Sequence, residues 1–355
     1  MKLNLTAFLL ISSLFLMGFD NPSSNSFQLI TSDPHHLEKI EAHVQTIHQS
    51  GRLRVVEVKV NAPRAIYKYL RPIKGQEKSY LYRSRGFIRQ IDKEIKHTLS
   101  LVDSELIKKD VVALSSYTTR LVNTDDNRKA TAVAQEKLAQ MGYEVQQICY
   151  REGACSVIAD KLGSTHPEKV ILVMAHIDSV GAKFAGADDN ASGTAALLEM
   201  ARVLKDGENK KTIRFFITNG EESGLLGAKH YASELKRSNK IKEIVLAINM
   251  DMVGYNANGI VELETDAKLE SLAKWFADLA AGYTNLKTKI SLGAWGSDHV
   301  PFLEAGTPTL LTIENWDTKT PCYHQACDKP ETLNYAYAAE ITKLNVAAVM
   351  TKDLE

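Results

Sequence analysis

Histidine and acidic residues stand at or shortly after the ends of three apolar stretches in the middle of the chain. The pattern comprises residues 170–175 before His176 and Asp178, residues 213–218 before Glu221 and Glu222, and residues 244–248 before Asp251. Imidazole nitrogens and carboxylate oxygens are ligands of Zn²⁺ and similar divalent ions. If the chain later returns to this place with a second imidazole, from His324, the groups suffice for two ions that share one carboxylate. The residue types therefore predict a dinuclear metal site.

The segments between these apolar stretches carry apolar residues at helical spacing, as at Leu198, Ala201 and Leu204. Buried strands that alternate with amphipathic helices form βαβ units, in which ligands gather at the carboxyl ends of parallel strands. Helical patterns also follow residue 99, and a long closing helix is expected at 331–353. We therefore predict an α/β fold of three layers, with a central, mostly parallel mixed β-sheet flanked by helices.

Each of these patterns also occurs without function. A single His at the end of a strand is usually a surface residue, adjacent Glu residues are usually solvated, and Asp-Asp-Asn before a helix is an ordinary N-cap. Their joint arrangement carries more weight, because each cluster stands at the end of an apolar stretch rather than in a polar loop. The arrangement favours a functional site.

Six segments, in their order along the chain, resemble the di-zinc exopeptidase family of bacterial secreted leucyl aminopeptidases. They are AHIDSVG, GADDNASG, NGEESGLLGA, NMDMVGY, GSDHVPF and YHQACD, and the resemblance covers roughly residues 100–355. The family lies in the superfamily of glutamate carboxypeptidases and glutaminyl cyclases. The resemblance implies the three-layer fold of zinc-dependent exopeptidases, two Zn²⁺ ions as cofactors and peptides as substrates.

The resemblance also implies which residues bind the metal. One zinc ion is expected on His176, Asp189 and Asp251, and the other on Asp189, Glu222 and His324. Asp189 would bridge both ions, one oxygen to each. Three protein ligands on each ion leave a position open for water or substrate, as catalytic zinc requires.

Two further acidic residues are expected to serve the reaction without binding metal. The resemblance makes Glu221 the general base, a role that suits a carboxylate within reach of an activated water. Asp178 stands two residues after His176, so both side chains point to the same side of a strand. We expect the Asp178 carboxylate to accept a hydrogen bond from the second ring nitrogen of His176.

Apolar and aromatic residues near the ligands are candidates for the substrate pocket. By analogy with leucine-preferring relatives, the residues expected to receive the first side chain of the substrate are Met252, Phe302, Ile313 and Trp316. Some relatives place an oxyanion-stabilising tyrosine before the SDH motif, where this chain has Trp295, and Tyr255 or Tyr323 are the open alternatives. We assign substrate binding to Met252, Phe302, Trp295 and Tyr323.

The four cysteines form two closely spaced pairs. Cys149 and Cys155 lie on either side of a Glu-Gly turn in a predicted hairpin, and Cys322 and Cys327 flank His324. In an exported chain such pairs indicate two local disulfide bonds, one of which would hold the loop that presents His324.

The first hundred residues or so differ from the rest of the chain in amino-acid composition and pattern. Residues 1–20 have the apolar run of a secretory signal peptide, and an uncleaved membrane anchor is the alternative. Residues 21–98 are predicted to form a small N-terminal pro-domain or appendage, and residues 99–355 the di-zinc peptidase domain. We expect the protein to be secreted or periplasmic.

The balance of charges excludes several classes of partner. The chain has 43 basic and 43 acidic residues and a formal net charge of +0. No net field favours nucleic acid or an anionic membrane surface. We expect peptide substrates, no nucleic acid, no stable membrane association after signal cleavage, and a monomer.

These observations predict an exported zinc-dependent aminopeptidase that uses metal-activated water and a Glu general base. Three alternatives stay open. A carboxypeptidase of the same superfamily would need a cationic clamp for the substrate carboxylate, and no Arg or Lys can be assigned to it. A glutaminyl cyclase-like acyltransferase would use a single zinc ion. A non-enzymatic binding ectodomain would not need the complete set of ligands.

Overall fold

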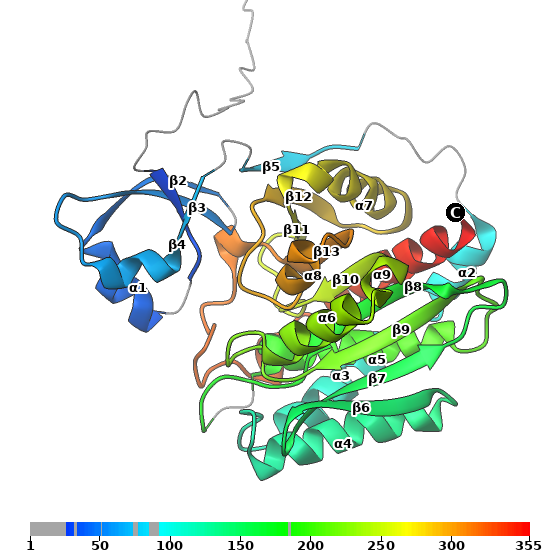
Figure 1. Cartoon of the computed structure of the whole chain (residues 1–355). Coiled ribbons are helices and arrows are strands. Elements are labelled where there is room, and N and C mark those ends of the chain that lie inside the picture. Colours follow the sequence, from blue (N-terminus) through cyan, green and yellow to red (C-terminus); the bar gives the residue numbers. More distant parts are fainter. Residues whose placement is uncertain (1–25, 32–33, 51, 74–76, 85–91, 184–185) are drawn as a thin grey trace, which may run out of the picture.

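The computed structural model describes residues 26–31, 34–50, 52–73, 77–84, 92–183 and 186–355. The predicted signal peptide, residues 1–20, lies outside the described residues. The chain forms a large α/β part and a small antiparallel sheet beside it (Figure 1).

A nine-stranded mixed sheet forms the centre of the large part, in the order β5-β12-β11-β13-β10-β8-β9-β7-β6. The strands are β5 (Lys78–Tyr82), β6 (Glu144–Arg151), β7 (Ala154–Lys161), β8 (His166–His176), β9 (Lys211–Thr218), β10 (Ile244–Met250), β11 (Ile260–Thr265), β12 (Lys287–Leu292) and β13 (Thr309–Glu314). The neighbours β9, β8, β10 and β13 all run parallel. Antiparallel pairings join β11 to β13 and β7 to β9 on either side of this group. The residues after β8, β9 and β10 therefore meet at one edge.

Helices cover both faces of this sheet. They are α2 (Lys93–Ser100), α3 (Ser104–Ser115), α4 (Asp125–Gln140), α5 (Gly193–Leu204), α6 (Leu226–Arg237), α7 (Glu270–Tyr283), α8 (Val300–Glu304) and α9 (Tyr335–Leu354). In β8, Ile171 and Val173 pack in one buried cluster with α3, α5 and α9, whereas Leu172 and Met174 pack in a second cluster with α6. This alternation is what a strand buried on both faces requires. The predicted three-layer α/β fold is confirmed.

The small sheet has the order β2-β3-β1-β4 and is covered by α1 (Pro34–Glu41). Its strands are β1 (Ser26–Leu29), β2 (Val44–Ser50), β3 (Leu53–Val58) and β4 (Leu70–Pro72). A separate apolar cluster holds it together, including Leu29, Ile40 and Val56, which are at most 1% exposed. A core of its own is what an appended domain needs.

The large part of the molecule begins earlier than the predicted boundary at residue 98. β5 already pairs with β12 of the central sheet, and Ile95 and Leu99 of α2 lie in the core of the large part. The small domain of the structure is therefore residues 26–72. The change of sequence texture near residue 99 marks the first long helices and not the edge of a domain.

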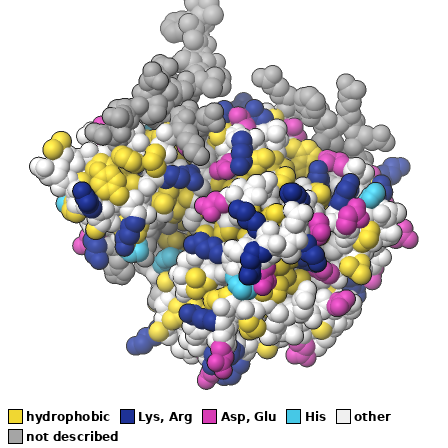
Figure 2. All heavy atoms as spheres, viewed as in Figure 1, with side chains coloured by type: hydrophobic (Ala, Val, Ile, Leu, Met, Phe, Trp, Pro, Cys, Tyr) yellow, Lys and Arg dark blue, Asp and Glu magenta, His cyan; other side chains and the backbone are white. Residues whose placement is uncertain are grey.

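Basic and acidic side chains are interspersed on the visible face of the molecule, as their equal numbers in the sequence lead one to expect (Figure 2). Within the described ranges, no helix combines the length and the apolar character that crossing a bilayer demands.

Candidate metal centre

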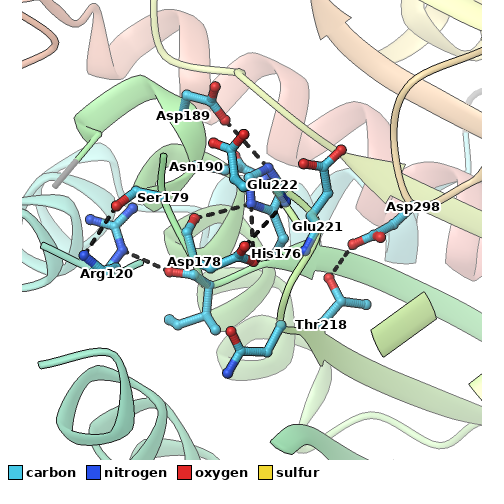
Figure 3. A network of polar contacts seen from close by, with 12 residues as sticks. Arg120, His176, Asp178, Ser179, Asp189, Asn190, Thr218, Glu221, Glu222 and Asp298 are labelled. Atoms are coloured by element: carbon cyan, nitrogen blue, oxygen red, sulfur yellow. Dashed lines mark hydrogen bonds and ion pairs between the residues drawn. The ribbon is translucent and has the colours of Figure 1, made fainter. Parts of the chain in front are cut away.

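The ligands predicted from the sequence come together at the carboxyl ends of three adjacent parallel strands. His176 is the last residue of β8, Glu221 and Glu222 follow β9, and Asp251 directly follows β10. Figure 3 shows His176, Glu221 and Glu222 gathered with Asp189 in one network. The site forms because parallel strands end at the same edge of a sheet.

Two groups of three ligand atoms share Asp189. Nε2 of His176 lies 3.3 Å from Oδ1 of Asp189 and 3.2 Å from Oδ1 of Asp251. Nε2 of His324 lies 3.1 Å from Oδ2 of Asp189 and 3.2 Å from Oε2 of Glu222. The ligand atoms within each group all lie within 4.8 Å of one another. The two oxygens of Asp189 thus face different groups, which is the arrangement of a bridging carboxylate.

The chemistry of the donor set fits divalent cations. Nδ1 of His176 donates to the main-chain oxygen of Asp178 at 3.1 Å, so Nε2 turns toward the carboxylates of Asp189 and Asp251. In a neutral imidazole that nitrogen is an acceptor facing acceptors, which only a proton or a cation between them can stabilise. Oε1 of Glu222 is likewise buried without a hydrogen-bond partner in the described part of the chain. Both groups have the nitrogen and oxygen ligands that Zn²⁺ takes.

The same crowding of carboxylates acts on the imidazole of His324. Burial lowers its pKa, but hydrogen bonds and charge from Asp189 and Glu222 outweigh burial and raise the pKa to about 11. The backbone of His324 also has a φ of 56°, in the left-handed region that residues other than glycine rarely adopt. Such a conformation persists where the surroundings fix it, and it is common at functional sites.

The Asp178 carboxylate has a different contact from the predicted one. Its Oδ1 lies 3.6 Å from Nδ1 of His176, and the main-chain oxygen of Asp178 takes the hydrogen bond instead. The two carboxylate oxygens accept hydrogen bonds from the main-chain amides of Glu221 and Glu222, each at 3.1 Å. Asp178 therefore holds the backbone of both glutamates, while its carbonyl orients His176.

Glu221 lines the same small cavity as the ligands but belongs to neither ligand group. Burial raises the pKa of its carboxyl well above the ordinary value, the imidazole of His176 opposes the rise, and Glu222 and Asp251 add to it. A carboxylate with a raised pKa is a better proton acceptor at neutral pH. Its position and its pKa suit a general base.

The loop that carries Asp189 is held by residues that belong to neither ligand group. Both oxygens of Asp328 accept from the main chain, at 2.8 Å from the amide of Asp188 and 3.1 Å from that of Asp189. Asp188 turns away from the ligands and accepts from the amides of Gly254 at 2.8 Å and Tyr255 at 3.2 Å. Sequence reasoning gave Asp328 no task, although it lies within the quoted YHQACD segment.

A buried arginine links two of the loops, and sequence reasoning missed it. Arg120 is fully buried, and its guanidinium donates to the main-chain oxygens of Ile177 at 2.7 Å and Gly186 at 2.9 Å. It therefore ties the loop after β8 to the loop that carries Asp189 (Figure 3). A single Arg in the connection between α3 and α4 gives no sequence signal for such a role.

The SDH segment supports the site from the side. Oγ of Ser297 donates to Oδ2 of Asp251 at 2.6 Å and accepts from Nδ2 of Asn249 at 2.8 Å. The hydroxyl of Thr218 donates to Oδ2 of Asp298, and Nε2 of His299 lies 3.2 Å from Oε1 of Glu264. Ser297 is thus the member of this segment that orients a ligand directly.

The predicted pocket residues divide into two sets. Met252, Tyr323, Ile313 and Trp316 line the cavity next to the ligands, and Tyr323 stacks on His324 with ring centres 3.8 Å apart. Trp295 is buried, and the neighbouring Gly296 lines the cavity. Phe302 does not reach this place, because it lies fully buried beneath α6 in contact with Tyr231. Phe302 is therefore a core residue, and its predicted place in the pocket is wrong.

Both predicted disulfide bonds are present. Cys149 and Cys155 join the two strands of the β6–β7 hairpin, and Cys322 and Cys327 close the loop that carries His324. Cys322 is buried, so the loop is anchored next to the ligand.

A three-layer α/β fold with imidazole and carboxylate ligands at the ends of parallel strands places the protein among metal-dependent hydrolases. The chain belongs to peptidase family M28, whose sequence model matches residues 156–349. The resemblance seen in the six segments is confirmed, and the protein is an enzyme of the peptidase class.

Known proteins resemble the chain over different lengths. Aminopeptidase YwaD of Bacillus subtilis is 38% identical over 191 residues, which are 52% of this chain and 41% of that protein. The fold of LapB from Legionella pneumophila covers 93% of this chain and all of that one, with a TM-score of 0.71 at 20% identity. A zinc aminopeptidase of Bacillus subtilis covers 71% of this chain and 95% of its own, with a TM-score of 0.62 at 19% identity.

Proposed function

We propose that the protein is an exported, zinc-dependent aminopeptidase that removes N-terminal residues from peptides. The observation that carries the proposal is the pair of ligand groups that share Asp189, with Glu221 in the same cavity. The Bacillus relatives named as aminopeptidases support the reaction, and the zinc aminopeptidase among them supports the metal. The two disulfide bonds support export, because disulfides persist in oxidising compartments.

The residues of the site have separate tasks in peptide hydrolysis. His176, Asp189 and Asp251 would hold one zinc ion, and Asp189, Glu222 and His324 the other. Bound zinc would lower the pKa of a water molecule and polarise the carbonyl of the substrate. Glu221 takes a proton from the attacking water as the new C–O bond forms. It then passes this proton to the leaving nitrogen as the C–N bond breaks.

The alternatives need features that the cavity does not offer. Among the described residues that line it, Arg52 is the only Arg or Lys. Its charge is already balanced by Glu264, with 3.2 Å between Nε and Oε2, so it does not provide a free clamp for a substrate carboxylate. A cyclase with one zinc ion would leave one of the two ligand groups without a cation. A binding ectodomain would not need Glu221 beside a complete set of ligands.

Metal content and turnover of a Glu221 variant test the proposal together. We expect about two zinc ions per chain by mass spectrometry and hydrolysis of aminoacyl p-nitroanilides. Glu221→Gln should keep the zinc and lower kcat by roughly 10²- to 10⁴-fold, because it removes the proton acceptor without removing a ligand. Glu136→Gln, on the exposed side of α4, is the matched control and should change neither quantity.

Other outcomes would contradict the proposal in distinguishable ways. One zinc ion per chain with reaction only at N-terminal glutamine would favour the cyclase. Release of C-terminal residues would favour the carboxypeptidase, and a protein without zinc or turnover would be a binding domain.

We further propose that the small domain, residues 26–72, acts as a pro-domain. With this domain in place, the cavity beside the ligands has a volume of ≈ 20 Å³. That is room for about one water molecule and not for an amino-acid side chain.

A further inference from the structure

The small domain inserts one side chain between itself and the ligands. Arg52 directly precedes the β3 strand, and its side chain is 3% exposed. Its Nη2 donates to the main-chain oxygens of Trp295 at 2.7 Å and Gly296 at 3.1 Å. The main chain is also held, since the amide of Arg52 donates to Glu262 at 2.9 Å and its carbonyl accepts from the Trp295 indole at 2.8 Å. The guanidinium and the main chain of Arg52 are thus both held in place, and this buried arginine closes the site.

Aromatic rings lie around the same guanidinium. Its central carbon is 4.7 Å from the ring centre of Trp295 and 5.1 Å from that of Trp316. Figure 1 shows the small sheet beside the orange segment after β13, to which Trp316 belongs. Two indole faces, one carboxylate and two carbonyl oxygens are the groups that recognise a guanidinium or an ammonium ion. We call this set, Glu264, Trp295, Gly296 and Trp316, the cation cradle.

The cation cradle opens onto the catalytic ligands. Arg52, Gly296 and Trp316 line one cavity together with Glu221 and Asp251. A substrate whose scissile carbonyl lies beside Glu221 must place its first side chain next to this point. Arg52 therefore fills the space that the first side chain would need.

The carboxylate of Glu264 decides what kind of side chain fits. Glu264 is fully buried on β11, and its Oε1 accepts from the amide of Trp295 at 3.1 Å. Its Oε2 has no hydrogen-bond partner in the described residues and lies 3.2 Å from Nε of Arg52. Oε1 also lies 3.2 Å from Nε2 of His299, so an apolar side chain in place of Arg52 would leave Oε2 alone without a partner, which is costly for a buried polar atom. A cationic side chain would pair with it.

We propose that the cation cradle is the subsite for the first residue of the substrate and selects arginine or lysine, and that Arg52 occupies it in the full chain. This inference rests on the aminopeptidase function proposed above. It replaces the expected preference for leucine, which followed from the resemblance alone.

Full-length variants measured on arginyl, lysyl and leucyl p-nitroanilides test the inference. Arg52→Ala should raise kcat/KM for the arginyl and lysyl substrates by about tenfold or more over the wild type, because it frees the cradle. In this variant the arginyl substrate should exceed the leucyl one by roughly 100-fold, since a buried polar group discriminates strongly against a partner that leaves it unpaired. Arg54→Ala is the matched control, because Arg54 stands only two residues further along the chain, in β3, but pairs with Glu41 at the surface.

A second substitution separates recognition from structure. Glu264→Gln added to Arg52→Ala should lower kcat/KM for arginyl and lysyl substrates by ~10- to 100-fold and for the leucyl substrate by less than ~3-fold. A merely structural role of Glu264 would lower all three equally. As a measurement without catalysis, L-arginine should raise the Tm of the Arg52→Ala variant, and L-leucine should raise it less. If the alanine variant does not fold, Arg52→Met keeps the apolar stem, and the same ratios are expected.

Different results would contradict the aminopeptidase function and the cation cradle. Zinc-loaded Arg52→Ala protein that hydrolyses no aminoacyl substrate would contradict the aminopeptidase function itself. Protein that prefers the leucyl substrate, or whose arginyl-to-leucyl ratio is unchanged by Glu264→Gln, would overturn the cation cradle alone.

Discussion

At the scale of single residues, most candidate ligands and the candidate base are held by defined hydrogen bonds with residues that belong to neither ligand group. Asp178 receives the amides of both Glu221 and Glu222, and Ser297 donates to Asp251. Partners of this kind fix the geometry of ligands, and their loss commonly weakens metal binding or activity by 10- to 100-fold, as an order of magnitude. The proposed site is therefore larger than its five candidate ligands and its candidate base.

Asp178→Asn tests this role. The amide keeps the shape of the side chain but has one acceptor oxygen and no charge, so one of the two backbone amides loses its partner. We expect kcat or zinc affinity to fall by roughly 10- to 100-fold. Zinc titration and steady-state kinetics measure the two effects. Asp110→Asn, which removes an ion pair with Lys137 away from the site, is the control. Unchanged zinc binding and kinetics in Asp178→Asn would rule out the orienting role.

At the scale of elements, loops are fixed by links that differ from one ligand to the next. The turn that carries Asp189 is held by Asp328 and Arg120, whereas the loop that carries His324 is closed by a disulfide bond. A rigid sheet edge places His176 and Asp251 directly, because each stands at or just after the end of a strand. The group that contains His324 therefore depends more on the position of a loop than the group that contains His176 does.

Replacing Cys322 and Cys327 by serine should therefore weaken the second ligand group selectively. Without the covalent link the loop gains conformational freedom, which must be lost again when His324 binds metal. We expect zinc content after dialysis to fall from about two ions toward one per chain. The double serine variant of Cys149 and Cys155 is the matched control, since that hairpin carries no ligand. Equal loss of zinc in both variants would argue against a local effect.

At the scale of the whole molecule, the small domain and the large sheet meet around buried acidic residues. Glu262 accepts from the amides of Arg52 and Trp316, which belong to the two different parts. Burial raises the pKa of Glu262 to about 7, while the charge of Lys289 and the Arg52 amide oppose the rise. We therefore expect the interface between the two parts to depend on pH near neutrality.

The sign of this dependence can be tested with Glu262→Gln. The folded protein holds the Glu262 proton up to about pH 7, whereas the unfolded chain releases it near the ordinary value of 4.5. The folded state then binds more protons between these values, so the contribution of Glu262 to stability falls as pH rises from 4.5 to 7. Urea unfolding at pH 5 and pH 7.5 should show a smaller loss in the variant than in the wild type. An identical loss in both would refute the assignment.

The sequence by itself determined the fold class and the disulfide pairs, and it pointed to the candidate ligands that the structure brings together. His176, Glu222 and Asp251 could be found because apolar stretches mark strands, and the residues after parallel strands meet at one edge. Cys322 and Cys327 could be paired because they stand close together in the chain. Each of these inferences uses residues a short distance apart or a periodic pattern.

Only the tertiary structure decided the contacts between distant segments. Arg52 meets Trp295 across 243 positions of the sequence, and Asp188 meets Asp328 across 140. Phe302 lies in the core and not in the predicted pocket. The Asp178 carboxylate accepts hydrogen bonds from the amides of Glu221 and Glu222 and not from His176. The physical reason is that such contacts follow from how whole layers pack, and packing leaves no periodic trace in the sequence around any one residue.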